Sequence, residues 1–99
     1  MSIKEQRAEI DAIDSELIRL LNMRARLAIK VGELKRDAGL SICDREREHE
    51  VIERACQANS GPLDENAIIR LFQCIIRESR LVEARAQGER SVARQKAEL

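Results

Sequence analysis

Apolar residues recur every three or four positions over the first third of the chain. They are Ile13, Leu17, Leu20, Leu27, Val31 and Leu34, and neither Gly nor Pro interrupts the run before Gly32. This spacing places them on one face of a helix. The pattern therefore predicts a first helix from Ile3 to about Asp37 that carries one long apolar stripe.

A glycine turn and a capping residue predict the second helix. Gly39 suits the left-handed conformation that commonly ends a helix, and Asp44 is a favourable N-cap residue. A short extended link joins the two. We expect the second helix over Arg45 to about Ala58, and its inward residues are Val51, Ile52 and Ala55.

A third helix is expected after a turn at residues 59–62, opening at Leu63 or Asp64. Its apolar positions are Ile68, Leu71, Phe72, Ile75, Ile76 and Val82. From Glu83 onward the pattern thins, and a polar tail from about residue 89 to 99 is expected to fray. The chain therefore reads as one all-α domain over 1–99, with one very long N-terminal helix, one short helix and one long helix.

The first helix is too long for a compact monomer. About 35 residues span roughly 50 Å, whereas a compact domain of this size has a radius of gyration of only about 13 Å. The apolar stripe would project beyond the rest of its own chain. We therefore expect an antiparallel homodimer, in which a second copy covers the stripe.

Composition narrows the classes of function. The chain has 18 basic and 18 acidic residues and 1% aromatic residues, so a nucleic-acid binder with a basic stripe or stacking platform is disfavoured. No signal-peptide core or membrane span is visible, which favours a cytoplasmic protein without membrane contact. The three cysteines lack metal-ligand spacing and read as free thiols. The only histidine, His49, reads as a surface residue.

Two cations lie on the first stripe, where apolar residues would otherwise continue. Arg24 comes four residues after Leu20. Lys35 lies about three turns further on, so it returns to nearly the same side of the helix. Between them, Ala28 and Gly32 leave space. Because a buried unpaired charge is costly, this slot predicts an anionic ligand or a protein carboxylate.

Arg7 is a more distant candidate on the same helix. It lies nearly five turns before Arg24, roughly 25 Å along the axis, so one helix cannot bring both residues to one small molecule. In an antiparallel dimer, however, Arg7 of one chain can approach the middle of the other. The alternative is an ordinary solvated arginine.

Two polar clusters on the later helices are candidates to face the same slot. Asp44, Arg47 and Glu48 share one side of the second helix through their i, i+3, i+4 spacing. Ser79 and Glu83, one turn apart, continue the stripe of the third helix. The first cluster can also be a helix cap with surface ion pairs, and the second can simply mark the end of the stripe.

The sequence shows no nucleophile–base pair, metal-ligand cluster or phosphate-binding glycine loop. Arginines, a lysine and a few polar groups around a helical cavity would bind a small dianion. Such a site would stabilise developing charge without covalent chemistry.

At this point the chain resembles a known family, the all-α (AroQ-type) chorismate mutases, from residue 3 to about 85. The resemblance rests on the order and spacing of four motifs. They are Arg7-x2-Ile10-x2-Ile13-Asp14, Leu20-Leu21-x2-Arg24-x3-Ala28-x2-Val31-Gly32-x2-Lys35, Ile42-Cys43-Asp44-Arg45-Glu46-Arg47-Glu48 and Leu71-Phe72-Gln73-x-Ile75-Ile76-x2-Ser79.

The resemblance implies an intertwined homodimer that converts chorismate to prephenate by a Claisen rearrangement, with no cofactor or metal. It implies that Arg24 and Arg47 hold the substrate carboxylates, and that Arg7 does so from the partner chain. Lys35 would donate to the ether oxygen of the breaking bond.

The remaining implied roles concern the ring and the far side of the ether oxygen. Asp44 and Glu48 would meet the ring hydroxyl, and Ser79 would line the pocket near a carboxylate. Glu83 falls where many members of the family have glutamine, opposite Lys35 at the ether oxygen. An ionised glutamate there would repel a dianion.

Two alternatives remain open at this stage. A related enzyme of the same fold, such as an isochorismate pyruvate-lyase, would keep the arginine clamps. A non-catalytic helical dimer that scaffolds or regulates a partner enzyme would not need Arg24, Lys35 and Arg47 together. Incubation with chorismate and identification of the product would separate these possibilities.

Overall fold

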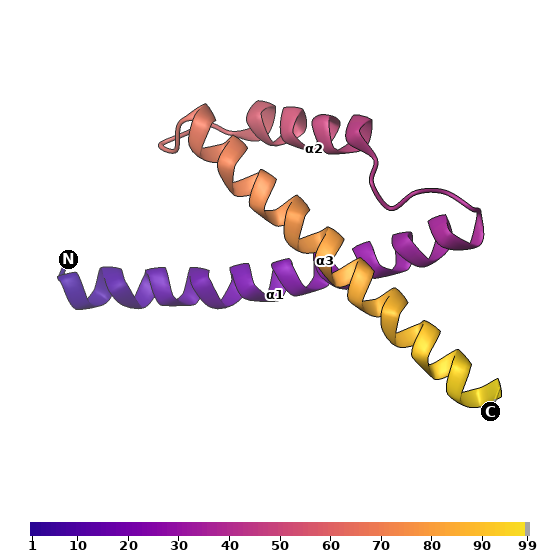
Figure 1. Cartoon of the computed structure of the whole chain (residues 1–99). Helices are drawn as coiled ribbons and strands as arrows, with labels where there is room; N and C mark the ends of the chain where they lie inside the picture. Colours follow the sequence, from indigo (N-terminus) through magenta and orange to yellow (C-terminus); the bar gives the residue numbers. More distant parts are fainter. Residues whose placement is uncertain (99) are drawn as a thin grey trace.

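The computed structural model describes the backbone of residues 1–98 and, apart from residues 90–94 and 98, their side chains. Within that range the chain forms three α-helices and no strand: α1 (Ile3–Asp37), α2 (Arg45–Ala58) and α3 (Glu65–Glu98). Helix α3 crosses the second half of α1 and packs along α2, as Figure 1 shows. The predicted all-α class is confirmed. None of these helices is long and apolar enough to cross a membrane.

Local side-chain chemistry fixes both ends of α1. The Ser2 hydroxyl accepts a hydrogen bond from the backbone N–H of Glu5 at 3.1 Å, and the Glu5 carboxylate accepts one from the N–H of Ser2 at 3.5 Å. This is a capping box. At the other end Gly39 has φ +72°, as predicted. The N–H of Leu40 then reaches back to the carbonyl of Lys35 at 2.7 Å, which turns the chain toward α2.

Aspartates cap the two later helices. Asp44 accepts a hydrogen bond from the N–H of Arg47 at 3.0 Å, which confirms the predicted start of α2. Asp64 accepts one from the N–H of Ala67 at 2.8 Å. Helix α3 therefore begins at Glu65, one residue later than the latest start expected from the sequence, because Asp64 is the cap and not the first helical residue.

The C-terminal part of α3 departs from the sequence prediction. A frayed tail was expected from about residue 89, yet the backbone stays helical to Glu98. The apolar stripe does end, but Ala, Arg, Gln, Glu and Lys are all good helix formers and no proline intervenes. Loss of an apolar stripe removes a packing surface without removing the helix. Leu99 lies outside the described residues.

The chain alone buries very little. Among the described side chains only Ile76 and Glu83 are buried, at 7% and 8% exposure, and none is fully buried. The radius of gyration is 17.7 Å and the molecule extends 63 × 30 × 15 Å, against about 13 Å for a compact domain of 100 residues. The first half of α1 carries exposed apolar residues, among them Ile10, Ile13 and Leu17 at 55%, 65% and 51%. A single copy therefore lacks a closed hydrophobic core.

Candidate active site

A pocket of about 250 Å³ lies where the second half of α1, the first turns of α2 and the middle of α3 converge. Every site residue predicted from the sequence lines it except Arg7. These residues are Arg24, Lys35, Asp44, Arg47, Glu48, Ser79 and Glu83. The helical spacing was therefore a sound guide to which side chains share the cavity. The predicted residues bring three cations and three carboxyl groups to the meeting point of three helices.

Helix α1 supplies two cations, and each is held by a neighbouring element. Arg24 donates a hydrogen bond from Nη1 to the Ser79 hydroxyl at 2.6 Å, and that hydroxyl donates to the carbonyl of Ile75 at 2.9 Å. Lys35 donates from Nζ to the carbonyl of Ile42 at 3.2 Å. These bonds orient the two cations from α3 and from the link before α2. Both line the same pocket, as the eleven-residue spacing predicted.

Glu83 is the buried acid of the pocket. Its side chain is 8% exposed, and its Oε2 atom is buried with no hydrogen-bond partner among the described residues. Burial raises the pKa of this carboxyl group above its ordinary value; Lys35 and then Arg24 oppose the rise, whereas Glu48 adds to it. Removal from water disfavours the charged form. The burial of Glu83 therefore extends to higher pH the range over which it is protonated and can donate a hydrogen bond.

The space at Gly32 holds one of the two occupants expected. The sequence suggested that Ala28 and Gly32 leave room between the two cations for an anionic ligand or a protein carboxylate. Ala28 does line the pocket, but Gly32 is buried against the Glu83 side chain. The protein carboxyl group anticipated from the cost of buried cations thus comes from α3 and lies on Gly32.

Helix α2 contributes the third cation and two carboxylates. Asp44 caps the helix and also lines the pocket. Arg47 lines it as well, while its guanidinium donates to Glu50 at 2.7 Å and stays about half exposed. Glu48 is partly buried and lies 3.5 Å from Arg80 of α3. The capping and ion-pair interpretation of this cluster is confirmed, and the role of its three side chains in binding stays a prediction that their place in the pocket lining supports.

Sequence reasoning missed Arg80 as a pocket residue, and it named most of the apolar pocket residues only as stripe or inward positions. Arg80 lines the pocket and pairs with Glu48, and apolar walls come from Leu27, Val31, Ile42, Val51 and Ile76. Arg80 follows Ser79 directly and precedes Glu83 by three positions, so the i, i+3 spacing on the third helix was an available signal.

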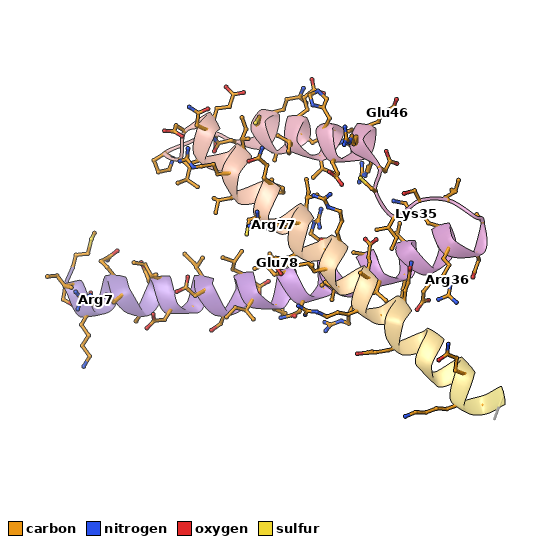
Figure 2. All side chains as sticks on the ribbon, in the orientation of Figure 1. Arg7, Lys35, Arg36, Glu46, Arg77 and Glu78 are labelled. Atoms are coloured by element: carbon orange, nitrogen blue, oxygen red, sulfur yellow. The ribbon has the colours of Figure 1, made fainter. Side chains whose placement is uncertain are left out.

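Arg7 lies elsewhere. Figure 2 shows it near the free N-terminal end of α1, far along the helix from Lys35, and it does not line the pocket. Within one chain the fold does not bring Arg7 to the other predicted site residues. The position of Arg7 agrees with the distance expected along a straight helix. Its predicted role in the pocket would therefore require a second copy of the chain.

The other reactive residue types lie outside the pocket. Cys43 and Cys74 are exposed and Cys56 is partly buried, and all three are free thiols, as predicted. His49 is exposed and lies 3.9 Å from Glu53, also as predicted for a surface residue. Among the described residues no group of three or more His, Cys, Asp or Glu side chains is arranged to hold a metal ion.

Comparison with known proteins gives one consistent result. The family profile described as chorismate mutase type II matches residues 6–84. The chain is 42% identical over 78 residues to a bifunctional chorismate mutase/prephenate dehydratase of Aquifex aeolicus, which covers 75% of this chain and 22% of that protein. It is 33% identical over 84 residues to a chorismate mutase of Methanocaldococcus jannaschii, covering 82% of this chain and 83% of the relative.

A solved structure has the same fold. The chorismate mutase (Form II) of Thermus thermophilus superposes with a TM-score of 0.82 at 35% identity, and the match covers 84% of this chain and 94% of that one. In contrast, the chain spans only about a fifth of the length of the bifunctional relatives that it matches.

Proposed function

Since the chain belongs to the type II chorismate mutase family, we propose that it converts chorismate to prephenate in the biosynthesis of phenylalanine and tyrosine. The observation that carries this proposal is the pocket itself. It places Arg24 and Lys35 of α1 and Arg47 of α2 around one cavity, with the buried acid Glu83 on the opposite helix. Such a cavity suits a small dianion with an ether oxygen.

The cations account for substrate binding. Chorismate has two carboxylates, and arginine guanidinium groups bind carboxylates through paired N–H donors. Arg24 and Arg47 approach the pocket from different helices, so they would hold the two ends of the molecule in a compact conformation. Because the reaction is intramolecular, selecting that conformation removes much of the entropic barrier.

Lys35 and Glu83 account for the chemical step. As the carbon–oxygen bond breaks, negative charge develops on the ether oxygen. A Lys35 ammonium group beside that atom would stabilise the transition state more than the ground state. Glu83 would donate a second hydrogen bond to the same oxygen in its protonated form, which its burial favours.

The polar groups of α2 would orient the ring. Asp44 and Glu48 line the pocket as carboxylates, and a carboxylate accepts a hydrogen bond from a hydroxyl group. They would bind the ring hydroxyl, while Ser79, already bonded to Arg24, would help to align that guanidinium with a substrate carboxylate.

The active unit in this proposal is an intertwined homodimer. Its support is the exposed apolar stripe of α1 and a largely apolar groove of about 630 Å³ between α1 and α3, lined by residues that include Leu17, Leu21, Leu71 and Phe72. A second copy laid antiparallel would cover both surfaces and bring its Arg7 to the pocket of the first, where it would bind a substrate carboxylate. Folding and association would then be inseparable.

The test is direct. The protein is incubated with chorismate, the loss of its ultraviolet absorbance is followed, and the product is identified by chromatography. Prephenate supports the proposal. Pyruvate release from isochorismate, with chorismate left intact, would instead assign the chain to the lyase alternative. No turnover of either acid by the dimeric protein would leave a non-catalytic role.

A further inference from the structure

Gly32 lies directly against Glu83 where α1 and α3 cross. A Cβ atom built on Gly32 would lie 3.2 Å from Cγ of Glu83, 3.3 Å from its Oε2 and 3.4 Å from its Cβ. The first two contacts are tighter than nine in ten real Cβ contacts, so Glu83 would have to give way by a few tenths of an ångström. The Glu83 side chain therefore occupies the space that a side chain at position 32 would take.

Neither backbone conformation nor helix formation explains a glycine at this position. The glycines with positive φ are Gly39 and Gly61, and Gly32 is not among them. Inside a helix glycine is a much poorer helix former than alanine. The close approach of Glu83 is the feature of the structure that does explain it.

We propose that Gly32 is a positioning residue for Glu83, and that its missing side chain fixes how far the Glu83 carboxyl group stands from the reacting oxygen. This inference rests on the function proposed above, in which Glu83 donates to the ether oxygen. Gly32 itself touches no substrate, because it does not line the pocket. It acts through the acid that packs on it.

The charged groups around Glu83 determine how its pKa responds when its carboxyl group is displaced. Lys35 and Arg24 face it from α1 and Glu48 faces it from α2, while Arg80 of its own helix pairs with Glu48. A methyl group at position 32 would push the carboxyl group away from α1 and toward the cavity. Less burial would lower the pKa of Glu83, whereas a greater distance from Lys35 and Arg24 would raise it, so the displacement should shift that pKa.

The chain offers a matched control for the substitution. Gly88 is also helical, on α3, and a Cβ atom there would meet nothing within 4 Å. Gly32→Ala and Gly88→Ala therefore make the same chemical change and favour helix formation in the same way. Only Gly32→Ala displaces Glu83.

The experiment measures kcat and KM for chorismate as a function of pH, together with the titration of the Glu83 carboxyl group. The titration uses carbon-13 NMR of protein labelled at glutamate carboxyl carbons, and loss of one resonance in Glu83→Gln assigns it. In Gly32→Ala we expect kcat to fall about fourfold, since a displacement of a whole ångström costs about a hundredfold. KM should change little, and the apparent pKa of Glu83 should differ from that of the wild type and of Gly88→Ala.

A double-substitution cycle separates positioning from general damage. In a Glu83→Ala background the added methyl group meets only the remaining Cβ atom, at an ordinary contact distance of 3.4 Å, so Gly32→Ala should cause no further loss of kcat. Equal losses with and without Glu83 would overturn the proposal. So would a Gly32→Ala protein whose Glu83 titration and pH profile match those of Gly88→Ala.

The two proposals fail in different ways. If the wild-type protein does not convert chorismate, the proposed function fails, while the NMR titration still reports whether Gly32 sets the environment of Glu83. If chorismate is converted but the titration does not respond to Gly32→Ala, only the positioning role fails.

Discussion

The two halves of α1 carry the same apolar stripe but have different surroundings. In the second half, Arg24 and Lys35 are partly buried, bonded to neighbouring elements and directed to the pocket. In the first half, Ile10 and Ile13 remain more than half exposed, and Figure 1 shows that half extending beyond α2 and α3. The second half contributes a site within its own chain, although Leu27 and Leu34 of its stripe stay 59% and 69% exposed. The first half contributes only a surface that its own chain does not cover.

This difference shows that an apolar stripe in a sequence predicts a covered helix face but does not show whether the same chain or a second chain covers it. A large exposed apolar patch of this kind usually marks an interaction surface. The second half of α1, called the pocket half below, already holds cations that suit a dianion, and the first half is called the free half. The free half holds Arg7, the one predicted site residue that the chain leaves outside the pocket. The comparison therefore predicts that the free half of α1 in one chain completes the pocket of a second chain.

The largest expected effect comes from a charge placed on the free half. Leu17→Glu puts a carboxylate on the stripe and in the apolar groove that Leu17 lines. An unpaired charge in a covered interface costs about 3–5 kcal/mol, so the dimer should dissociate at micromolar concentration in sedimentation experiments. Ser15→Glu adds the same charge on roughly the opposite side of the helix and should remain dimeric. Equal behaviour of the two variants would mean that the stripe is not the interface.

On the pocket half, Lys35→Ala should raise the activation free energy of turnover by about 2.7–4 kcal/mol, the scale of one removed oxyanion donor. Its ammonium group interacts most strongly with charge that exists only in the transition state, so kcat should fall more than substrate affinity. Lys30→Ala, an exposed lysine that does not line the pocket, is the control for lost charge. A rise in KM alone would restrict Lys35 to binding.

Complementation tests the two halves together. Arg7→Ala and Arg24→Ala should each lower kcat/KM by an amount that corresponds to about 1.5–3 kcal/mol of lost transition-state stabilisation, the value of a hydrogen bond to a charged group. In each mixed dimer one of the two pockets regains both arginines. After full exchange of an equal mixture half of the dimers are mixed, so activity should recover to about a quarter of that of the wild type. The measurement is activity after subunit exchange, which mass spectrometry verifies. Mixed dimers as inactive as their parents would place Arg7 outside the site.

The pH dependence of activity tests the role of Glu83, which packs against the pocket half. The pKa of Glu83 is raised chiefly by burial, so its protonated, donating form is present at low pH and is lost as pH rises through that pKa. Activity should decline in the same direction, and so should the stabilisation that the folded state gains by holding the proton. Glu83→Gln keeps a donor at every pH and should flatten the profile.

Turnover of the wild type and of Glu83→Gln is measured from about pH 4.5, near the ordinary glutamate pKa, to about pH 9. A wild-type profile as flat as that of the glutamine variant would show that Glu83 does not act on the breaking bond.

The smallest effect is expected from Arg80, on the α3 side of the pocket. Its pair with Glu48 is partly exposed, so Arg80→Gln should change the free energy of unfolding by less than about 1 kcal/mol. Loss of a cation from the pocket wall should raise KM a few-fold with kcat nearly unchanged. Arg77→Gln, which removes a cation outside the pocket lining, is the control. Identical KM values for the two variants would make the Arg80–Glu48 pair a surface feature only.

Predictions from local sequence held well. The matched directions of Arg24 and Lys35 follow from the fixed rotation of a helix, and the turn at Gly39 and the cap at Asp44 follow from residue chemistry within a few positions. The start of α3 was missed by one residue because a capping aspartate and a first helical residue look alike in a sequence. The continuation of α3 to Glu98 was missed because apolar periodicity reports packing and not helicity.

The contacts between helices were harder to predict. The packing of Glu83 on Gly32 and the pairing of Arg80 with Glu48 depend on how α3 crosses α1 and α2. That crossing follows from the fit of many side chains at once, and single-residue spacing does not encode it.

By itself the sequence determined the three helices, the apolar face of each one and the two cations on α1, because backbone rotation and capping act over a few residues. The family resemblance already suggested Glu83 opposite Lys35, but the tertiary structure alone decided that Glu83 is buried and fills the space at Gly32. Glu83 is distant from Lys35 along the chain, and only the packing of α3 against α1 makes it a buried acid. Its raised pKa, on which the proposed donor to the reacting oxygen depends, follows from that burial because a charge is disfavoured where protein replaces water.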